Sequence, residues 1–107
     1  MDIQLKKGFL EYCVLAALKK KDSYGYQIVK DVSNCIDISE STLYPILKRL
    51  ETDKQVSTYS VEHNGRLRKY YHIETKGIDQ IKKFLEDWEQ IQKIYQYIEE
   101  EMKDDKE

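Results

Sequence analysis

Hydrophobic positions in the first half of the chain recur with the spacing of helices. Between residues 39 and 50 four apolar side chains are spaced i, i+3, i+4 and i+7, which is one face of a helix. They are Leu43, Ile46, Leu47 and Leu50. Ser39 is expected to cap this helix. Two earlier helices are expected: Lys6–Leu18, whose near-continuous apolarity predicts contact on more than one face, and Tyr24–Ser33, capped by Ser23.

The other face of the 39–50 helix is polar and carries groups that can contact nucleic acid. Its residues are Ser41, Thr42, Tyr44, Lys48 and Arg49. Hydroxyls, an aromatic ring and cations can hydrogen-bond base edges and phosphates in a major groove wide enough for a helix. An ordinary amphipathic surface helix is the alternative that this segment alone leaves open. Pro45 removes a backbone donor, which predicts an irregular first turn or a later start.

Two runs of β-prone residues follow, Val56–Glu62 and Arg68–Ile73. Asn64-Gly65 between them predicts a hairpin, because both residues accept positive φ. The tip and the returning strand carry Arg66, Arg68 and Lys69. A cationic hairpin after two short helices predicts a wing that reaches phosphates or a minor groove, whereas a solvated hairpin with charged edges is the alternative. Tyr70 and Tyr71 alternate across the strand, so one of them is expected in the core.

From Thr75, the expected cap, to about Met102 the pattern predicts one long helix. Its apolar residues are spaced alternately three and four apart, which makes a heptad seam. The seam comprises Ile81, Phe84, Trp88, Ile91, Tyr95, Ile98 and Met102, and Phe9 of the first helix is expected beside it. Ile78, Leu85 and Ile94 form a flank expected to touch the chain's own first helix. Since a small domain cannot bury such a seam, a second copy of the chain is its expected partner.

These elements together predict a mostly α fold with a small β-hairpin. A winged helix-turn-helix DNA-binding domain is expected in residues 1–74, and a C-terminal dimerisation helix with a frayed tail in residues 75–107. The net charge is −2, but residues 1–78 hold 13 Lys and Arg against 10 Asp and Glu, and residues 79–107 hold 5 against 10. This asymmetry indicates two surfaces with different tasks, of which the basic one suits nucleic acid.

Composition and motifs argue against several other classes of protein. Because no run of about 18 apolar residues exists and the start lacks a signal-peptide pattern, a cytoplasmic location is expected. Cys13, Cys35, His63 and His72 lack the close ligand pairs of a zinc site, so no metal and no cofactor are expected. No nucleophile with a base, glycine-rich phosphate loop or apolar carboxylate pair is found, so an enzyme is not expected.

With these segments in place, the chain resembles the PadR family of bacterial winged-helix transcriptional regulators over roughly residues 8–102. Four motifs carry the resemblance. They are Gly8-x-Leu10-Glu11, Tyr24-Gly25-Tyr26-Gln27-Ile28, Ser41-Thr42-Leu43-Tyr44-Pro45-Ile46-Leu47-Lys48-Arg49-Leu50-Glu51 and Gly65-Arg66-x-Arg68-Lys69-Tyr70-Tyr71. The family usually has glycine where this chain has Ser41, and it carries a proline at the position of Pro45.

The resemblance implies a homodimer that binds an inverted-repeat operator and usually represses transcription. The short tail resembles the small subgroup with a single C-terminal dimerisation helix. In some of these regulators the dimer encloses an apolar pore in which planar aromatic effectors stack on a tryptophan, and Trp88 occupies the matching place. A tryptophan at a heptad position can equally serve packing, so both roles for Trp88 stay open.

The expected DNA contacts follow from these motifs. Bases would be contacted through Ser41, Thr42 and Tyr44 next to Ser39, and phosphates through Lys48, Tyr26 and the wing residues Arg66, Arg68 and Lys69. Arg49 either contacts DNA or pairs with Asp53 four residues later. The alternative function is a winged helix that docks another protein in place of DNA, which the net negative charge would fit.

Overall fold

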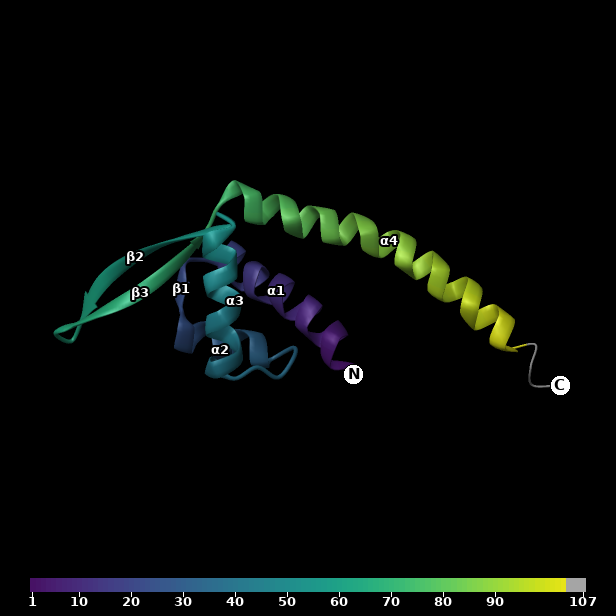
Figure 1. Cartoon of the computed structure of the whole chain (residues 1–107), viewed down its shortest axis with the longest axis horizontal. Helices are drawn as coiled ribbons and strands as arrows, with labels where there is room; N and C mark the ends of the chain where they lie inside the picture. The colour runs from purple at the N-terminus through teal and green to yellow at the C-terminus, as the bar shows by residue number, and fades with distance from the viewer. Residues whose placement is uncertain (104–107) are drawn as a thin grey trace.

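The computed structural model describes residues 1–103. The elements follow in the order α1 (Ile3–Lys20), β1 (Ser23–Tyr24), α2 (Gly25–Ser33), α3 (Glu40–Thr52), β2 (Val56–His63), β3 (Arg66–Ile73) and α4 (Thr75–Lys103), as Figure 1 shows. The three strands form one antiparallel sheet in the order β1-β3-β2. The mostly helical architecture with a small β-hairpin is the one predicted, whereas the expected frayed tail, residues 104–107, lies outside the described residues.

One hydrophobic core joins the first three helices to the sheet. Its members are Leu10, Val14, Leu15, Leu18, Ile28, Val32, Leu43, Leu47, Leu50, Val56, Tyr71 and Ile73. α1 supplies four of them from one side, while Phe9 and Tyr12 on another side contact the Phe84 ring of α4. Contact on more than one face of α1 is therefore confirmed, although Ala16 remains exposed.

α2 and α3 form the helix-turn-helix. The Ser39 cap is confirmed, since its Oγ accepts from the backbone N–H of Thr42 at 3.3 Å. α3 begins at Glu40 and runs through Pro45, so the later start is wrong. The Ser23 cap is also wrong: Ser23 lies in β1, its buried hydroxyl has no hydrogen-bond partner, and α2 starts after Tyr24 without a side-chain cap.

The hairpin is longer than the sequence pattern suggests. β2 and β3 pair from Val56 opposite Ile73 to His63 opposite Arg66, which leaves only Asn64 and Gly65 in the turn. Both turn residues have positive φ, 50° and 78°, as the Asn-Gly pair predicts. On β3 the buried ring is that of Tyr71, and Tyr70 lies on the opposite face, so the prediction that one of the two tyrosines belongs to the core is confirmed.

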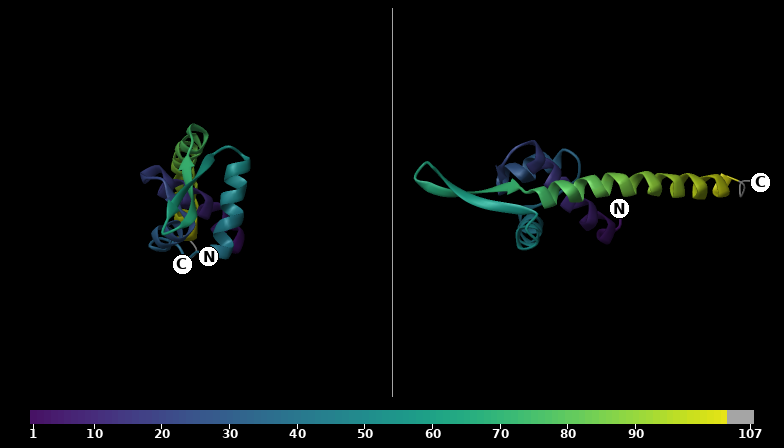
Figure 2. Two further views of the ribbon diagram at one scale, coloured as in Figure 1. Left: turned by 90° about the vertical axis from the view of Figure 1, so that its left-hand side faces the viewer. Right: turned by 90° about the horizontal axis from the view of Figure 1, so that it is seen from above.

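Only the beginning of α4 lies on the rest of the chain. The helix has 29 residues and is therefore about 44 Å long, and it extends well beyond α1 in Figure 2. Gly77 is buried and Ile78 packs against the core, as predicted for Ile78. Thr75 is the first helical residue and not the expected cap. Although α4 has the length to span a bilayer, no helix within residues 1–103 is also apolar enough to do so.

The predicted flank of α4 is wrong at two of its three positions. Leu85 and Ile94 are 58% and 59% exposed and do not cover α1. The stripe that meets the body is instead Gly77, Ile81 and Phe84, spaced four and three residues apart. Ile81 and Phe84 of this stripe begin the predicted seam, and Ile81 is partly buried against the chain's own core. A contact of Ile81 with a second copy stays a prediction.

Candidate nucleic-acid interface

The inward face of α3 packs in the hydrophobic core, and its outward face is polar. Leu43, Leu47 and Leu50 are fully buried. The residues predicted to contact DNA all lie on the exposed remainder of the circumference: Ser39, Ser41, Thr42, Tyr44, Lys48 and Arg49. Tyr44 is 47% exposed, and no salt bridge is formed by Lys48 within residues 1–103. α3 therefore presents hydroxyls, a phenol and one unpaired cation to its surroundings.

Three hydroxyls meet at the start of α3. The Ser39 Oγ lies 3.0 Å from the Ser41 Oγ and 3.1 Å from the Thr42 Oγ1, while it also caps the helix. Each hydroxyl keeps further donor or acceptor capacity, since a hydroxyl carries one hydrogen and two lone pairs. The arrangement fixes a small polar cluster at the exposed helix end.

Arg49 does not pair with Asp53, one of its two expected roles, whereas the other role, a DNA contact, stays a prediction. Its guanidinium forms an ion pair with Glu11 of α1. Asp53, the alternative partner, instead accepts a hydrogen bond from the Lys76 ammonium at 2.8 Å, which together with the Gln55 amide lowers the pKa of the Asp53 carboxyl. The sequence could not reveal the Arg49–Glu11 pair, because the two residues are distant in the chain.

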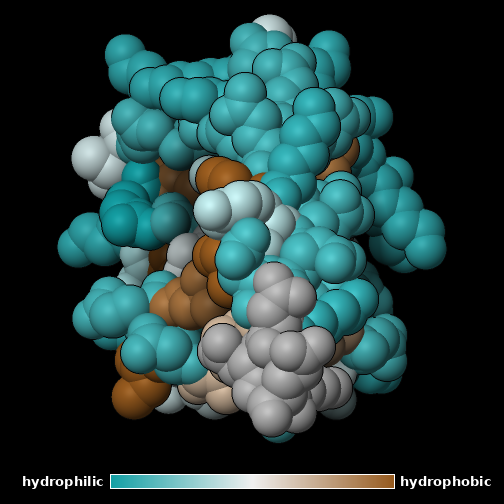
Figure 3. Space-filling model, turned by 90° about the vertical axis from the view of Figure 1, so that its right-hand side faces the viewer, coloured by the Kyte–Doolittle hydropathy of each residue, from teal (hydrophilic) through white to brown (hydrophobic). Residues whose placement is uncertain are grey.

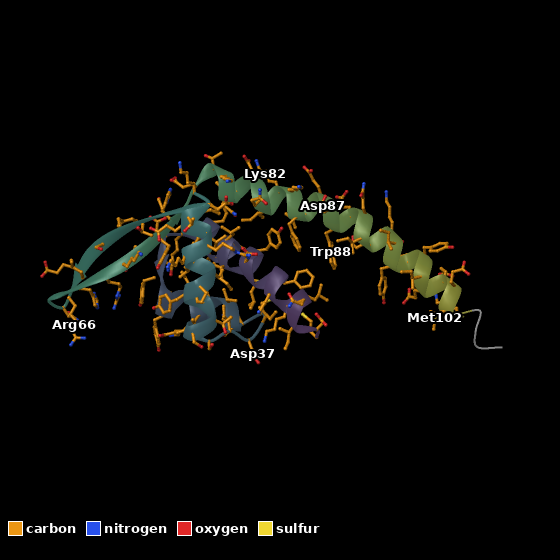
Figure 4. All side chains as sticks on the ribbon, in the orientation of Figure 1. Asp37, Arg66, Lys82, Asp87, Trp88 and Met102 are labelled. Carbon is orange, nitrogen blue, oxygen red and sulfur yellow. The ribbon has the colours of Figure 1, made fainter. Side chains whose placement is uncertain are left out.

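The three wing cations have different surroundings. Arg66 lies at the hairpin tip, at the opposite end of the molecule from Met102, as Figure 4 shows. The Arg68 guanidinium carbon lies 4.0 Å from the centre of the Tyr24 ring, a cation–π contact. The Lys69 Nζ is 3.6 Å from the Glu51 Oε1. Only Arg66 has no ionic or aromatic partner among the described residues.

Four of the predicted contact residues surround one cavity. It lies between the start of α2, α3 and β3, has a volume of about 410 Å³, and is called here the α2–α3–β3 hollow. The predicted residues in its lining are Tyr26, Tyr44, Arg68 and Lys69. Phenolic hydroxyls and cations around a hollow of this size are suited to an anionic oxygen. Tyr24, which the sequence did not single out as a site residue, also lines the hollow, and the Arg68 guanidinium lies over its ring.

A second polar network, also missed from the sequence, lies at the base of the wing. The Asp22 carboxylate accepts a hydrogen bond from the Tyr59 hydroxyl and one from the His72 Nδ1, each at 2.7 Å. The Tyr59 hydroxyl and the His72 imidazole lower the pKa of Asp22, and the same contacts raise the pKa values of Tyr59 and of His72. Asp22 thereby ties the segment before β1 to both long strands.

Aromatic rings gather where α1 meets α4. The Phe9 ring contacts the rings of Phe84 and Trp88 edge-on, with centroids 6.0 and 6.2 Å apart. Tyr12 stacks on Phe84 at 4.3 Å, and Phe84 on Trp88 at 6.2 Å. Trp88 keeps 37% of its surface exposed. Packing within the chain therefore covers part of the Trp88 surface and leaves the rest exposed.

Beyond Trp88 the predicted seam has no cover in the described chain. Its exposed members are Ile91, Tyr95, Ile98 and Met102. Figure 4 places Met102 on the same side of α4 as Trp88, with Lys82 on the opposite side. Figure 3, which looks from the α4 end, shows hydrophobic residues open to solvent between hydrophilic borders. An apolar strip on so small a chain is typical of an interaction surface.

The cysteines lie outside these surfaces. Both thiols are free, with Cys13 half-buried in α1 and Cys35 exposed after α2. Burial, with the neighbouring Cys35 thiol, raises the pKa of Cys13. Within residues 1–103 no three His, Cys, Asp or Glu side chains are placed to share a metal ion.

A helix-turn-helix followed by a paired hairpin, with β1 completing the sheet, defines the winged-helix class. The model of the transcriptional regulator PadR-like family matches residues 14–83. The chain belongs to this family of transcriptional regulators, which confirms the resemblance seen in its motifs.

Solved structures agree with this assignment. The chain is similar to a transcriptional regulator from Clostridium thermocellum, with 32% identity, a TM-score of 0.77, and coverage of 88% of this chain and 93% of that one. It is 45% identical to smu.1704 from Streptococcus mutans UA159, with a TM-score of 0.68 and 77% of each chain covered. Bacillus subtilis PadR in complex with operator DNA shares the fold, at 22% identity and a TM-score of 0.67 over 72% of this chain and 46% of that one.

Proposed function

We propose that this chain is a cytoplasmic, DNA-binding transcriptional repressor that acts as a homodimer on an inverted-repeat operator. The observation that carries the proposal is the gathering of Tyr26, Tyr44, Arg68 and Lys69 around one hollow beside the exposed face of α3. An operator complex is known for Bacillus subtilis PadR, which shares the fold. A helix face of hydroxyls flanked by phenols and cations offers both base-edge and phosphate contacts.

The contacts divide by chemistry. Ser41 and Thr42, with the Ser39 hydroxyl beside them, face base edges, and Lys48 faces phosphate. Arg66 at the hairpin tip reaches the flanking backbone or the minor groove, with Arg68 and Lys69 behind it. Arg49 has a structural role in this proposal, because Glu11 already neutralises it.

The uncovered part of α4 supports the homodimer. Trp88, Ile91, Tyr95, Ile98 and Met102 continue a heptad pattern that a second α4 can match, and Phe9 lies beside the first of them. The single C-terminal helix is that expected of the short subgroup. Two copies joined through α4 would address half-sites about 10 base pairs apart, or a multiple of that distance.

Binding to labelled duplex from the gene's own upstream region, measured by fluorescence anisotropy over a range of salt, tests DNA recognition. We expect affinity to fall steeply with salt. The logarithm of the association constant, plotted against the logarithm of the salt concentration, should have a slope of about −0.9 per phosphate contact. An unrelated duplex of equal length is the control and should bind more weakly. A flat salt response, or no binding to any duplex at low salt, would contradict the proposal and favour the protein-docking alternative.

Sedimentation and footprinting test the assembly. We expect a dimer at micromolar concentration and two protected half-sites related by a two-fold axis. A monomer in dilute native solution, or one unpaired half-site, would rule out the dimeric arrangement. Repression itself is tested with a reporter gene under the same upstream region, whose expression should rise when the chain is removed.

A planar aromatic effector is the last part of the proposal, supported by the partial exposure of Trp88 beside Phe9 and Phe84. Trp88 is the single tryptophan of the chain, so its fluorescence reports on this place alone. Planar dyes should quench it and weaken DNA binding, and Trp88→Ala should abolish the effect while the dimer persists. No quenching across a varied panel of dyes would eliminate the effector.

A further inference from the structure

Gly25, the first residue of α2, has no room for a side chain. A Cβ atom built on its backbone would lie 2.9 Å from Tyr44 Cζ and 3.1 Å from Tyr44 Cε1, and closer still to the Tyr44 hydroxyl oxygen. Each of these distances is shorter than ordinary van der Waals contact. The start of α2 and the Tyr44 ring of α3 therefore approach as closely as a glycine permits.

Backbone conformation does not explain the glycine. Gly25 is buried in a regular helix, and Gly65 is the one glycine of the described residues with positive φ. Glycine is also a poor helix former compared with alanine. What Gly25 supplies at this position is the space that the Tyr44 ring occupies.

Close packing against Gly25 determines where the Tyr44 hydroxyl can lie. Leu43, its neighbour on α3, is fully buried, so the α3 backbone is held by the core. The Tyr44 ring then lies against the α2 start and lines the α2–α3–β3 hollow together with Tyr26, Arg68 and Lys69. A hydroxyl held beside two cations and a second phenol is positioned before any ligand arrives, which reduces the conformational entropy lost on binding.

We propose that Gly25 is a positioning residue for DNA binding: by leaving space for the Tyr44 ring, it fixes the Tyr44 hydroxyl in the α2–α3–β3 hollow, where it donates to a backbone phosphate. The inference rests on the function proposed above and refines it, because it gives Tyr44 a phosphate in place of a base edge. Phosphate contacts carry no direct sequence information, so loss of this contact weakens specific and unrelated duplexes alike.

The experiment is a double-mutant cycle on the full chain with Gly25→Ala, Tyr44→Ala and both together. Gly25→Ala should lower affinity for the upstream duplex and for an unrelated duplex by about tenfold each, the loss of one hydrogen bond to a charged group. In the Tyr44→Ala background the same change should alter affinity less than about twofold. The salt slope should stay unchanged in every variant, since a phenol releases no counterion.

Gly8→Ala is the matched control, because Gly8 is also helical but nothing lies within 4 Å of its would-be Cβ. It should bind both duplexes as the parent chain does. Equal losses from Gly25→Ala in both Tyr44 backgrounds, parent-like affinity of Gly25→Ala, or a salt slope that falls with affinity would each overturn the inference and leave DNA binding itself intact. If the parent chain binds no duplex, the proposed function fails, and the inference with it.

If the Gly25→Ala chain does not fold, thermal unfolding of the double variant shows whether the close approach of the Tyr44 ring is the cause. Recovery of a cooperative transition in Gly25→Ala/Tyr44→Ala supports the close approach as the cause. A double variant that also fails to fold, while Tyr44→Ala folds, overturns it.

Discussion

Apolar residues have different roles at the two ends of this molecule. In the winged-helix body, twelve of them form one closed core between α1, α2, α3 and the sheet. In α4 from Leu85 onward, every large apolar residue of the described chain is exposed. Trp88, packed on Phe9 and Phe84 yet 37% exposed, marks the transition. Apolar residues of the winged-helix body stabilise a single chain, whereas those of α4 from Leu85 onward contribute to stability only when a partner covers them.

The comparison predicts opposite results for two leucine-to-alanine substitutions. Leu47→Ala removes a fully buried side chain and should lower the free energy of unfolding by about 2–5 kcal/mol. Leu85→Ala, at a 58% exposed position, should change it by less than about 0.5 kcal/mol. Urea unfolding followed by circular dichroism measures both. A comparable loss from Leu85→Ala would show that Leu85 is covered in solution, by its own chain or by a second copy.

A charge in the uncovered seam should act on assembly and not on the fold. Ile98→Asp should weaken self-association by about 2 kcal/mol or more, roughly thirtyfold in the dissociation constant, while near-ultraviolet signals of the body remain. Sedimentation at several concentrations gives the dissociation constant. Gln96→Glu, which adds the same charge at a polar exposed position, is the control. If the two variants associate equally well, the seam is not the contact between copies.

Two neighbouring cations on α3 allow the internal contacts of the winged-helix domain to be distinguished from its proposed DNA contacts. Arg49→Gln breaks the ion pair with Glu11 and should reduce stability by about 1 kcal/mol or less, since the arginine is largely exposed. Lys48→Gln should leave stability unchanged and reduce the salt slope of DNA binding by about 1. If Arg49→Gln also reduced the salt slope of DNA binding, Arg49 would belong with the proposed DNA contacts.

The smallest expected effect concerns the base of the wing and depends on pH. Because hydrogen bonds from Tyr59 and His72 lower the pKa of Asp22 from its usual 3.8, its contribution is present above that pH and lost as pH falls through the folded-state value. The His72 pKa is raised from 6.5 by Asp22, so its contribution is complete below 6.5 and lost as pH rises through the higher value. Stability lost in Asp22→Asn should therefore be greatest between pH 3.8 and 6.5.

Both side chains are more than a third exposed, so the difference should stay below about 1 kcal/mol. Thermal unfolding of the parent and Asp22→Asn chains at several pH values measures it. His63→Gln, which changes an exposed histidine of β2 outside the Asp22 network, is the control substitution. A difference between parent and Asp22→Asn chains that is as large well below pH 3.8 and well above pH 6.5 as it is between these values would mean that the network does not couple to folding.

Local patterns were sufficient to predict the helices and the hairpin. The spacing from Leu43 to Leu50 predicts the buried face of α3, and Asn64-Gly65 predicts the turn. Both signals lie within a few residues, where helix period and turn chemistry act directly. β1 was not predicted, since a strand of two residues is too short to show an alternation of apolar and polar positions.

Contacts between distant segments were not accessible in this way. A heptad seam shows which residues share a helix face, but not where one partner ends and the next begins, so Ile81 was expected at a second copy and Leu85 at α1. The Glu11–Arg49 pair and the Gly25–Tyr44 contact join helices whose relative placement the whole core determines. A glycine in a helical pattern was the one available signal for the second of these contacts.

The uninterrupted backbone of α4 has a consequence for how its length can vary. Each residue inserted between the docked beginning and the uncovered end would turn that end by about 100° and advance it by about 1.5 Å. One extra residue would place Gln90 and Glu101 where Ile91 and Met102 now lie, whereas seven would restore the direction of the seam to within about 20°. Related chains that differ in the length of this helix should therefore differ by whole pairs of turns.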